Sequence, residues 1–505
     1  MRLTVPNRWF VLVVGCALSA IPIAPGSSAQ EQNREPTTVD IIDLGAHAER
    51  LTRSYADAPD HEHPYYQSRF GSVGLHVLSY RQILPLHMHR MAHVAVAVVS
   101  GEPEIVQLHV TEDAVGPRST LFGPGSLVYS PPYSGHRWTN PSSTAMHVLL
   151  VFASPPLMAP LDTNVYVDDD DDRLLLGGEP LVVDTKRELR SLLESGRPAR
   201  QRRLPALSGK LTSLSVSATT TIDPSPGPTF VYAAGGQGRL RCAGTHRLQS
   251  QTLAFLPRNT ACEVDSEPAT PLALILFRPE DDGVSDILRT ETKLYSQADE
   301  ELVIRDFFRD RRDGVFLDVG AAHYRRNSTT FYLEERLGWS GVAVDALGEF
   351  GPDYLEHRKK TRFVNYLITD KAAGNQRFYR ADGYLEVSSV SRKAAEDQAL
   401  LYRGNDAITE LEIPSITLTA LLDRLEIAEI DFLSMDIEEH EPAALAGFDI
   451  DRFRPELVCI EAHALVQDAI FKYFTEHGYR RLDRYVSYDR FNWYFAPADT
   501  AGRRP

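Results

Sequence analysis

The sequence predicts a multidomain protein in which an all-β double barrel is followed by an α/β domain with an open parallel sheet. Short apolar runs broken by Gly, Pro and Ser fill residues 39–160 and 204–283, which is typical of small β barrels. Residues 314–321 form an apolar run that ends in an acid and a small-residue turn, and a helix is predicted over residues 328–337. Strand, tight turn and helix in that order begin a doubly wound sheet.

Acidic residues stand at the carboxyl ends of the strands predicted for the α/β domain. They are Asp318, Asp345, Asp436, Glu438 and Glu461. In an open α/β sheet this edge forms the ligand crevice. An acid after the second strand, here Asp345, is where such folds hold a ribose diol. The glycine turn alone is also typical of an ordinary strand-to-helix connection, so the prediction depends on the convergence of the acids.

Residues 294–498 resemble the FkbM family of S-adenosylmethionine-dependent methyltransferases. The resemblance rests on Tyr-Ser-Gln at 295–297, Leu-Gly-Trp-Ser-Gly at 337–341, Asp-Ile-Glu at 436–438 and Phe-Asn-Trp-Tyr-Phe at 491–495. It implies a Rossmann-like class I methyltransferase domain with S-adenosylmethionine as cofactor. The implied cofactor-binding residues are Asp318, Gly320, Ala321, Asp345 and Asp370, the last one near the adenine.

Methyl transfer to a hydroxyl needs a base in addition to a positioned acceptor. The candidates on the crevice rim are Asp436, Glu438, Glu461 and His463. We favour His463 because imidazole titrates near neutral pH, and a role in holding a loop is the alternative. The sequence departs from the family at two places: His323 and Tyr324 stand in the turn, where the family has its next glycine, and Glu439 replaces the usual glycine.

The first barrel region carries a pattern of histidines. His87, His89 and His93 share parity, which on a strand places them on one face, and His136 follows a Pro-containing turn. With a Gly-rich hairpin at 122–125 this pattern resembles the cupin barrel. The resemblance places His87, His89 and His136 on the family's metal ligands, with His93 as a fourth in place of the missing glutamate. Imidazole suits Zn, Fe, Cu or Ni. The alternative is a ligand-binding barrel with buried polar histidines.

Residues 161–203 are predicted as a linker with five consecutive acids at 168–172 and a helix that Asp184 caps. Residues 204–283 repeat the strand and glycine-turn pattern without a ligand histidine, so we expect a degenerate second cupin-like half without a metal. Cys242 and Cys262 lie on two strands of this half, either as a disulfide or as two unpaired thiols.

Residues 1–29 have the pattern of an export signal. Arg2 and Arg8 precede an apolar stretch at 9–24, and small residues follow at 27–29. The leader predicts an exported or periplasmic protein, with a membrane role only if it stays uncleaved. This conflicts with a cytoplasmic methyl donor, unless the leader is an anchor facing the cytoplasm, the start codon is misassigned, or the methyltransferase fold has become a binding module.

The chain has 505 residues, 43% of them hydrophobic and 24% charged, and a net charge of −16. These values fit globular domains, and the negative charge argues against a nucleic-acid partner. The sequence thus favours O-methylation of a small-molecule or saccharide acceptor by a methyltransferase with a metal-binding cupin domain. The alternative is an exported metal-binding cupin enzyme or sensor that carries a vestigial methyltransferase fold. The acceptor and the oligomeric state do not follow from the sequence.

Overall fold

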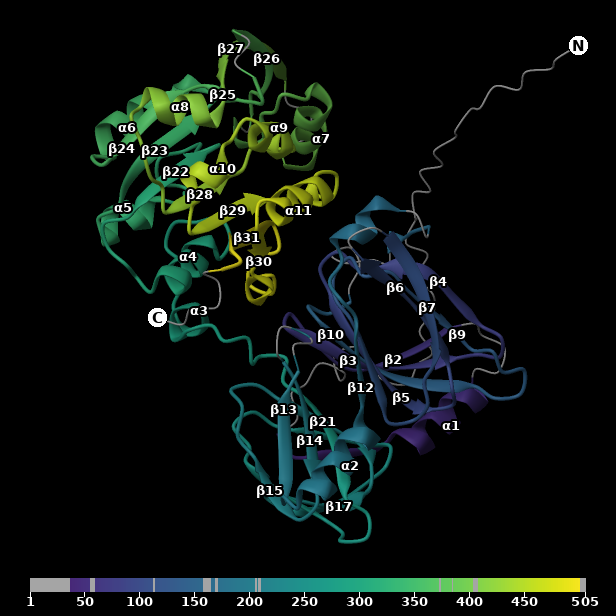
Figure 1. Ribbon diagram of the computed structural model, residues 1–505. Coiled ribbons are helices and arrows are strands. Elements are labelled where there is room, and N and C mark those ends of the chain that lie inside the picture. The colour runs from purple at the N-terminus through teal and green to yellow at the C-terminus, as the bar shows by residue number, and fades with distance from the viewer. Residues whose placement is uncertain are drawn as a thin grey trace, which may run out of the picture. The chain divides into compact units, whose positions relative to one another are not determined.

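The computed structural model describes residues 37–54, 60–111, 114–157, 165–168, 171–204, 207, 210–371, 374–383, 385–402 and 407–499 (Figure 1). The predicted leader, residues 1–29, lies outside these ranges. No helix within these ranges is long and apolar enough to cross a membrane.

Two antiparallel sheets form the first barrel (Figure 1). One sheet has the order β12-β8-β5-β10-β3-β2 and the other β11-β4-β9-β6-β7. The strands are β2 (Asp60–Ser68), β3 (Gly71–Leu78), β4 (Ile83–Met88), β5 (His93–Ser100), β6 (Glu104–Thr111), β7 (Ala114–Leu121), β8 (Ser126–Ser130), β9 (His136–Thr139), β10 (His147–Ser154), β11 (Val165–Tyr166) and β12 (Leu181–Asp184). Val96 and Leu149 of one sheet share a buried core with Ile105 and Trp138 of the other, so apolar packing holds the two sheets together.

The second barrel repeats this plan with sheets of six and four strands. Their orders are β1-β19-β16-β21-β14-β13 and β15-β20-β17-β18. The strands are β1 (Asp40–Asp43), β13 (Ala199–Arg203), β14 (Leu211–Val216), β15 (Thr219–Ile222), β16 (Thr229–Gly235), β17 (Gln237–Arg241), β18 (Thr245–Gln249), β19 (Thr252–Leu256), β20 (Cys262–Ser266) and β21 (Leu272–Phe277). Leu240, Val264 and Leu274 lie in its core.

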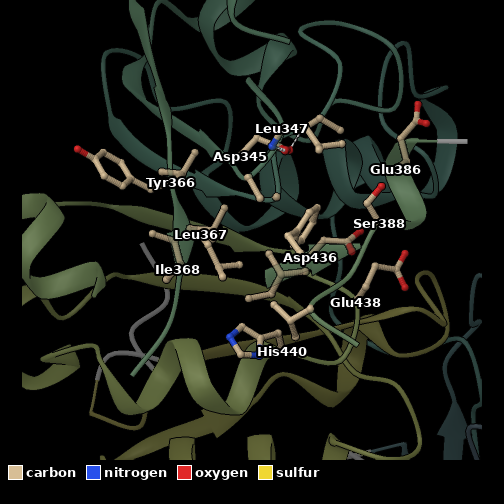
Figure 2. A pocket seen from close by; sticks show the side chains of 18 of the residues that line it. Asp345, Leu347, Tyr366, Leu367, Ile368, Glu386, Ser388, Asp436, Glu438 and His440 are labelled. Carbon is tan, nitrogen blue, oxygen red and sulfur yellow. Dashed lines mark hydrogen bonds between the residues drawn. The ribbon is translucent and has the colours of Figure 1, made fainter. Parts of the chain in front are cut away.

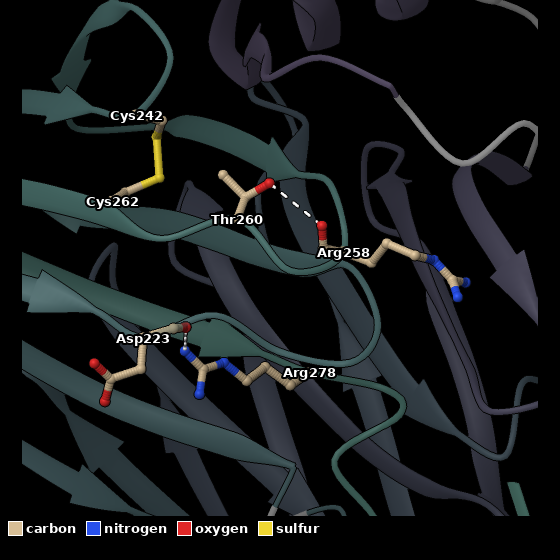
Figure 3. The surroundings of a disulfide bond; sticks show 6 residues. All are labelled: Asp223, Cys242, Arg258, Thr260, Cys262 and Arg278. Carbon is tan, nitrogen blue, oxygen red and sulfur yellow. Dashed lines mark hydrogen bonds between the residues drawn. A yellow bond between two sulfur atoms is a disulfide. The ribbon is translucent and has the colours of Figure 1, made fainter.

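Cys242 and Cys262 form a disulfide in the second barrel (Figure 3). Strands β17 and β20 pair with Arg241 opposite Glu263, which brings the two cysteines next to each other, with a Cα–Cα distance of 4.4 Å. The two residues are therefore bonded and are not the unpaired thiols of the alternative. Cys459 is buried and free.

The stretch predicted as a linker, residues 161–203, is in fact built into both barrels. β11 pairs with β4, β12 pairs with β8, and β13 forms the edge of the second barrel next to β14. The helix α2 (Thr185–Ser195) lies between them, and the Asp184 side chain accepts hydrogen bonds from the Lys186 and Arg187 backbones as predicted. The linker prediction is wrong because charged and exposed residues can form edge strands, whose pairing depends on distant partners.

Strand β1, near the start of the described chain, belongs to the second barrel. This differs from the prediction, which assigned all of residues 39–160 to the first barrel. Strand β1 pairs with β19 from Asp40 to Asp43. Val39 and Ile41 pack on the core of the second barrel. The described chain therefore contributes β1 to the second barrel before it forms the first barrel.

The α/β domain has a seven-stranded sheet with the order β24-β23-β22-β28-β29-β31-β30 (Figure 1). The strands are β22 (Val315–Val319), β23 (Ser340–Asp345), β24 (Thr361–Asn365), β28 (Phe432–Met435), β29 (Leu457–Glu461), β30 (Tyr479–Arg481) and β31 (Asn492–Pro497). The first five in spatial order are parallel, and β31 is antiparallel to both of its neighbours. The first strand in sequence, β22, is the middle one of the five parallel strands. The chain adds β23 and β24 on one side of it and β28 and β29 on the other, so the strand order reverses at β22. Such a switch point is where open α/β sheets bind ligands.

Helices cover both faces of this sheet. Leu317 and Val319 pack with α8 (Leu418–Arg424), α9 (Glu441–Ala446) and α11 (Gln467–Glu476). Phe316 points to the other face and packs with α4 (Glu300–Phe308) and α5 (Phe331–Leu337). Because both faces are buried, the inner strands β22, β28 and β29 are mostly apolar and show no regular alternation with polar residues.

A small sheet extends the α/β domain beside the crevice. It has the order β25-β27-β26, with β25 (Leu367–Ile368), β26 (Asn375–Ala381) and β27 (Ile408–Ile416). Leu367 and Phe378 of this sheet share a buried cluster with Leu347, which follows β23. The small sheet therefore builds one wall of the crevice described next.

Candidate functional site

The glycine turn after β22 lies against two neighbouring strands. Gly320 has a φ of 80°, and a Cβ at this position would lie 1.7 Å from the Asp436 carbonyl oxygen. The backbone N–H groups of Gly320 and Ala321 donate to the Val344 carbonyl at 2.9 and 3.2 Å. Only glycine fits here, because both the conformation and the close approach exclude a side chain.

Asp345 ends β23 and holds the turn from the other side. Its Oδ2 accepts a hydrogen bond from the Ala322 N–H at 2.9 Å, and its Oδ1 accepts one from the Leu347 N–H at 2.8 Å. Burial raises the pKa of Asp345 to about 7, and the neighbouring Asp318 adds to this. Each carboxylate oxygen keeps a second lone pair, so Asp345 still has acceptor sites for a ligand hydroxyl.

A pocket with mostly apolar walls adjoins Asp345, and we call it the Asp345 pocket (Figure 2). Leu347, Phe350, Leu367 and Phe378 line it beside Asp345. Flat apolar walls next to a polar acceptor are suited to a ring that carries hydroxyl groups at one end.

A second pocket, which we call the Glu461 pocket, continues from the first and is polar. The two pockets share Gly320, Ala322, Glu386, Asp436 and Glu438. The Glu461 pocket is also lined by Asp318, Glu461, His463 and Asn492. The structure thus brings all four predicted base candidates to one crevice, next to the predicted cofactor-binding residues Asp318, Gly320, Ala321 and Asp345.

His463 and three acids form a cluster in the Glu461 pocket. His463 Nε2 lies 2.9 Å from Glu461 Oε1. Ligand atoms of Glu438, Glu461 and His463 all lie within 4.8 Å of one another. The Asp436 side chain opens into the crevice and its carboxyl group adjoins that of Glu461. A cluster of this kind can take up a proton or bind a cation.

Burial and mutual repulsion favour the protonated form of the acids in this cluster. Burial raises the pKa of Glu438 to about 9, and the charges of Glu461 and Asp436 contribute. The pKa of Glu461 is raised well above its ordinary value by burial and by Asp436. The pKa of Asp436 is raised because protein surrounds the carboxyl group, although the side chain is open to the crevice.

The backbone at Glu438 and Glu439 is strained. Their φ angles are 55° and 71°, in the left-handed region that favours glycine. Glu439 stands where the resembled family has its usual glycine. It nevertheless adopts the left-handed conformation that favours glycine. Strain of this kind costs about 1–3 kcal/mol per residue and is common at functional sites.

Asp318 lies at the floor of the crevice. It is buried, and its Oδ2 accepts a hydrogen bond from the Thr330 hydroxyl at 2.7 Å. Burial raises the pKa of Asp318 to about 6, against the lowering effect of Thr330 and Arg358. Asp318 therefore faces the Glu461 pocket. Through its hydrogen bond with Thr330 it also positions the segment that leads from the turn into the helix.

Asp370, predicted as an adenine-binding residue, is not among the residues that line the two pockets. Its side chain is 46% exposed and lies 4.0 Å from Lys371. Tyr366, Leu367 and Ile368 line the Asp345 pocket instead. The segment leaves the main sheet after Asn365 and joins the small sheet, and Asp370 follows the strand β25 of that sheet.

In the first barrel, His87, His89 and His136 form a buried cluster. His87 lies on β4 and pairs directly with His136 of β9, and their ring centroids are 4.4 Å apart. His89 follows β4, with its ring 5.3 Å from His87 and 5.4 Å from His136. Ligand atoms of all three lie within 4.8 Å of one another.

This cluster has the chemistry of a metal site. The Nδ1 atoms of His87 and His136 lie 2.8 and 3.1 Å from backbone carbonyls, which leaves Nε2 as the ligand atom of each. His89 Nδ1 is buried and has no hydrogen-bond partner among the described residues. Burial lowers the pKa of His89 to about 3 and that of His136 well below its ordinary value, so the rings are neutral, as metal ligands must be.

His93 does not join the cluster, which corrects its prediction as a fourth ligand. Its Nδ1 lies 2.7 Å from the Tyr129 hydroxyl and its Nε2 lies 2.8 Å from Asp483 Oδ2 in the α/β domain. Both ring nitrogens are therefore engaged. The parity argument fails because β4 ends at Met88 and the chain turns before β5 begins at His93.

Sequence reasoning did not single out Glu441, a buried acid next to the residues of the Glu461 pocket in the sequence. It is fully buried, its Oε1 accepts a hydrogen bond from the Ile437 N–H at 3.0 Å, and its charge acts on Glu438 and Glu461. The spacing of three residues from Glu438 was the available signal. Strand periodicity does not reveal this spacing, because a turn lies between the two residues.

The antiparallel barrels and the histidine cluster define the N-terminal region as cupin-like, and the crevice defines the C-terminal domain as a ligand-binding α/β domain. Residues 318–481 match the methyltransferase FkbM domain model. This part of the chain is therefore a domain of the FkbM methyltransferase family, as the resemblance predicted, and the family suggests S-adenosylmethionine as cofactor. A search of curated proteins finds no sequence that matches the chain.

Solved structures similar to part of the chain include a salicylate 1,2-dioxygenase from Pseudaminobacter salicylatoxidans. It shares 16% identity and a TM-score of 0.36, and the match covers 51% of this chain and 86% of that one. A cupin 2 conserved barrel domain protein from Leptotrichia buccalis shares 13% identity and a TM-score of 0.32, with 47% of this chain and 94% of that one covered.

Proposed function

We propose that the chain is an S-adenosylmethionine-dependent methyltransferase that methylates a hydroxyl group of a small molecule or saccharide. The observation that carries this proposal is one continuous crevice in which Asp345 and the glycine turn adjoin Asp436, Glu461 and His463. It lies in the segment that matches the FkbM family. The order of the main sheet and its two covered faces support a Rossmann-like class I fold for this domain.

The crevice residues fit the cofactor. Asp345 would accept hydrogen bonds from the ribose hydroxyls, and Leu347, Phe350 and Leu367 would contact the adenine. The turn at Gly320 and Ala321 gives the close backbone approach that the methionine part requires. When bound, S-adenosylmethionine supplies a methyl group on a positively charged sulfur.

The Glu461 pocket provides what the acceptor needs. Glu461 orients the His463 ring through the 2.9 Å contact, and His463 takes the proton of the acceptor hydroxyl. Asn492 offers a polar contact on the pocket wall.

Calorimetric titration with S-adenosylmethionine tests this function. Charge-assisted hydrogen bonds contribute about 1.5–3 kcal/mol, so Asp345→Ala should weaken binding about ten- to a hundredfold. Asp353→Ala, at an exposed acid of α6 (Gly351–His357), is the control and should bind like the unchanged chain. If the folded, unchanged chain shows no binding, the proposal fails.

A second candidate function is an exported metal-binding cupin enzyme or sensor with a vestigial methyltransferase fold. The disulfide between Cys242 and Cys262 favours it, because disulfides persist in oxidising compartments. The predicted leader points the same way. The same titration separates the two candidates, since a vestigial domain would not bind S-adenosylmethionine.

We further propose that the first barrel binds one transition metal ion, Zn, Fe, Cu or Ni, through His87, His89 and His136. Three neutral imidazoles suit these ions better than Ca²⁺ or Mg²⁺. The ion would act as a Lewis acid toward a ligand that enters the barrel.

A further inference from the structure

Gln107, on β6 of the first barrel, has a buried side-chain amide that lacks an acceptor. The residue is 4% exposed, and its Nε2 is buried with no hydrogen-bond partner among the described residues. Leaving a buried donor unpaired is unfavourable, because the group loses its hydrogen bonds to water and gains none in return. Such a group in a folded protein indicates an acceptor that the chain itself does not provide.

The strand pairing directs Gln107 toward the histidine cluster. Gln107 pairs directly with His136 of β9, which pairs on its other side with His87 of β4. Directly opposed residues of antiparallel strands lie on the same face of the sheet, so the three side chains form a row. Ile105, on the same face of β6, packs in the core between the two sheets, whereas Leu108 belongs to a separate cluster on the other face. The Gln107 amide therefore points into the barrel beside the imidazoles.

The three imidazoles leave the charge of a divalent ion uncompensated. The group of ligand atoms that the described residues offer in the barrel consists of His87, His89 and His136 and includes no carboxylate or thiolate. Imidazole binds a metal in its neutral form, so an ion held by these three side chains keeps both of its positive charges. In a buried position this favours an anion as a further ligand.

We propose that the barrel site takes a small carboxylate ligand, which binds the metal ion through one oxygen and accepts a hydrogen bond from Gln107 Nε2 with the other. This inference rests on the metal site proposed above. A carboxylate meets both requirements at once, since it carries the negative charge that the ion favours and a second acceptor atom for the amide. Gln107 would then be a specificity-determining residue, which selects carboxylates over anions that have no second acceptor.

Titration of the Co²⁺-loaded chain with acetate tests this inference, because the visible absorption of Co²⁺ responds to a change of its ligands. The His87→Ala, His89→Ala chain gives the background from Co²⁺ bound elsewhere. We expect Gln107→Leu to keep its Co²⁺, measured by elemental analysis, and to bind acetate about ten- to a hundredfold more weakly, because a charge-assisted hydrogen bond is lost. Its affinity for chloride, a single-atom anion, should stay unchanged. Gln201→Leu, at an exposed glutamine of β13, is the control and should bind acetate like the unchanged chain.

A second variant, Gln107→Glu, keeps the shape of the side chain and places a negative charge beside the ligand, so it should also weaken acetate binding at least about tenfold. It carries the test if the leucine variant does not fold. The inference is overturned if the Co²⁺-loaded chain does not respond to acetate, if the folded variants bind acetate unchanged, or if Gln107→Leu weakens acetate and chloride equally. Loss of Co²⁺ from folded Gln107→Leu would make Gln107 a metal ligand and overturn it as well. Absence of Co²⁺ from the unchanged chain would refute the metal site itself, which keeps the two failures apart.

Discussion

The three buried imidazoles of the first barrel allow a direct test at the level of single residues. His87→Ala combined with His89→Ala removes two of three ligands, so the purified chain should lose about one equivalent of transition metal by elemental analysis. His93→Ala is the matched control and should keep the metal, since both of its ring nitrogens bind other groups. Equal metal content in the double variant and the unchanged chain would contradict the barrel site.

The sequence could place a single residue correctly only where a regular strand carries that residue. Asp345 directly ends an apolar strand, and its position at the crevice follows from that run alone. His93 and Asp370 each lie beyond an irregular segment, so counting along a strand assigns them to the wrong place. His89 is the first residue after β4, so it lies close enough to His87 to join the cluster.

At the level of secondary-structure elements, α4 carries a buried acid whose titration should affect stability. Burial and Asp489 raise the pKa of Glu300 to about 8. Between the ordinary pKa and this value the folded state holds a proton that the unfolded state has lost, so stability falls as pH rises from about 5 to 8, by up to about 1.4 kcal/mol per pH unit.

Glu300→Gln should remove this part of the pH dependence. The glutamine oxygen can still accept from the Ala298 N–H, where the Glu300 contact is 2.6 Å, and its amide nitrogen replaces the oxygen that accepts from the Asn492 side chain at 3.3 Å. Urea unfolding at pH 8 should show the variant more stable by roughly 1–3 kcal/mol, with little difference at pH 5. Glu356→Gln serves as the exposed control. Equal slopes with pH for both variants would show that Glu300 is not protonated in the folded state.

Elements with local signals were predictable and those that depend on distant pairing were not. The helix α2 begins where its capping Asp184 predicts. In contrast β13, with four exposed residues, has no apolar pattern and exists through its pairing with β14. The short β1 likewise depends on β19, more than 200 residues away in sequence, as its partner pairs show.

For the whole molecule, the state of its cysteines should reveal the compartment in which it works. If the leader is cleaved near Ala29, Cys16 is lost and three cysteines remain, two of which form the Cys242–Cys262 disulfide. In the chain-entropy model, closing a loop with a sequence separation of 20 stabilises the fold by about 3 kcal/mol. A reducing cytosol would keep both thiols free.

Thiol titration of the denatured protein, isolated from its native host without reductant, distinguishes these cases. One free thiol, from Cys459, is expected for an exported chain, and adding reductant before denaturation should raise the count to three. Export would separate the crevice from the cytoplasmic methyl donor and favour the metal-binding cupin function. Three or four free thiols without reductant would contradict export and place the protein where S-adenosylmethionine is available, because only a reducing compartment leaves that pair unbonded.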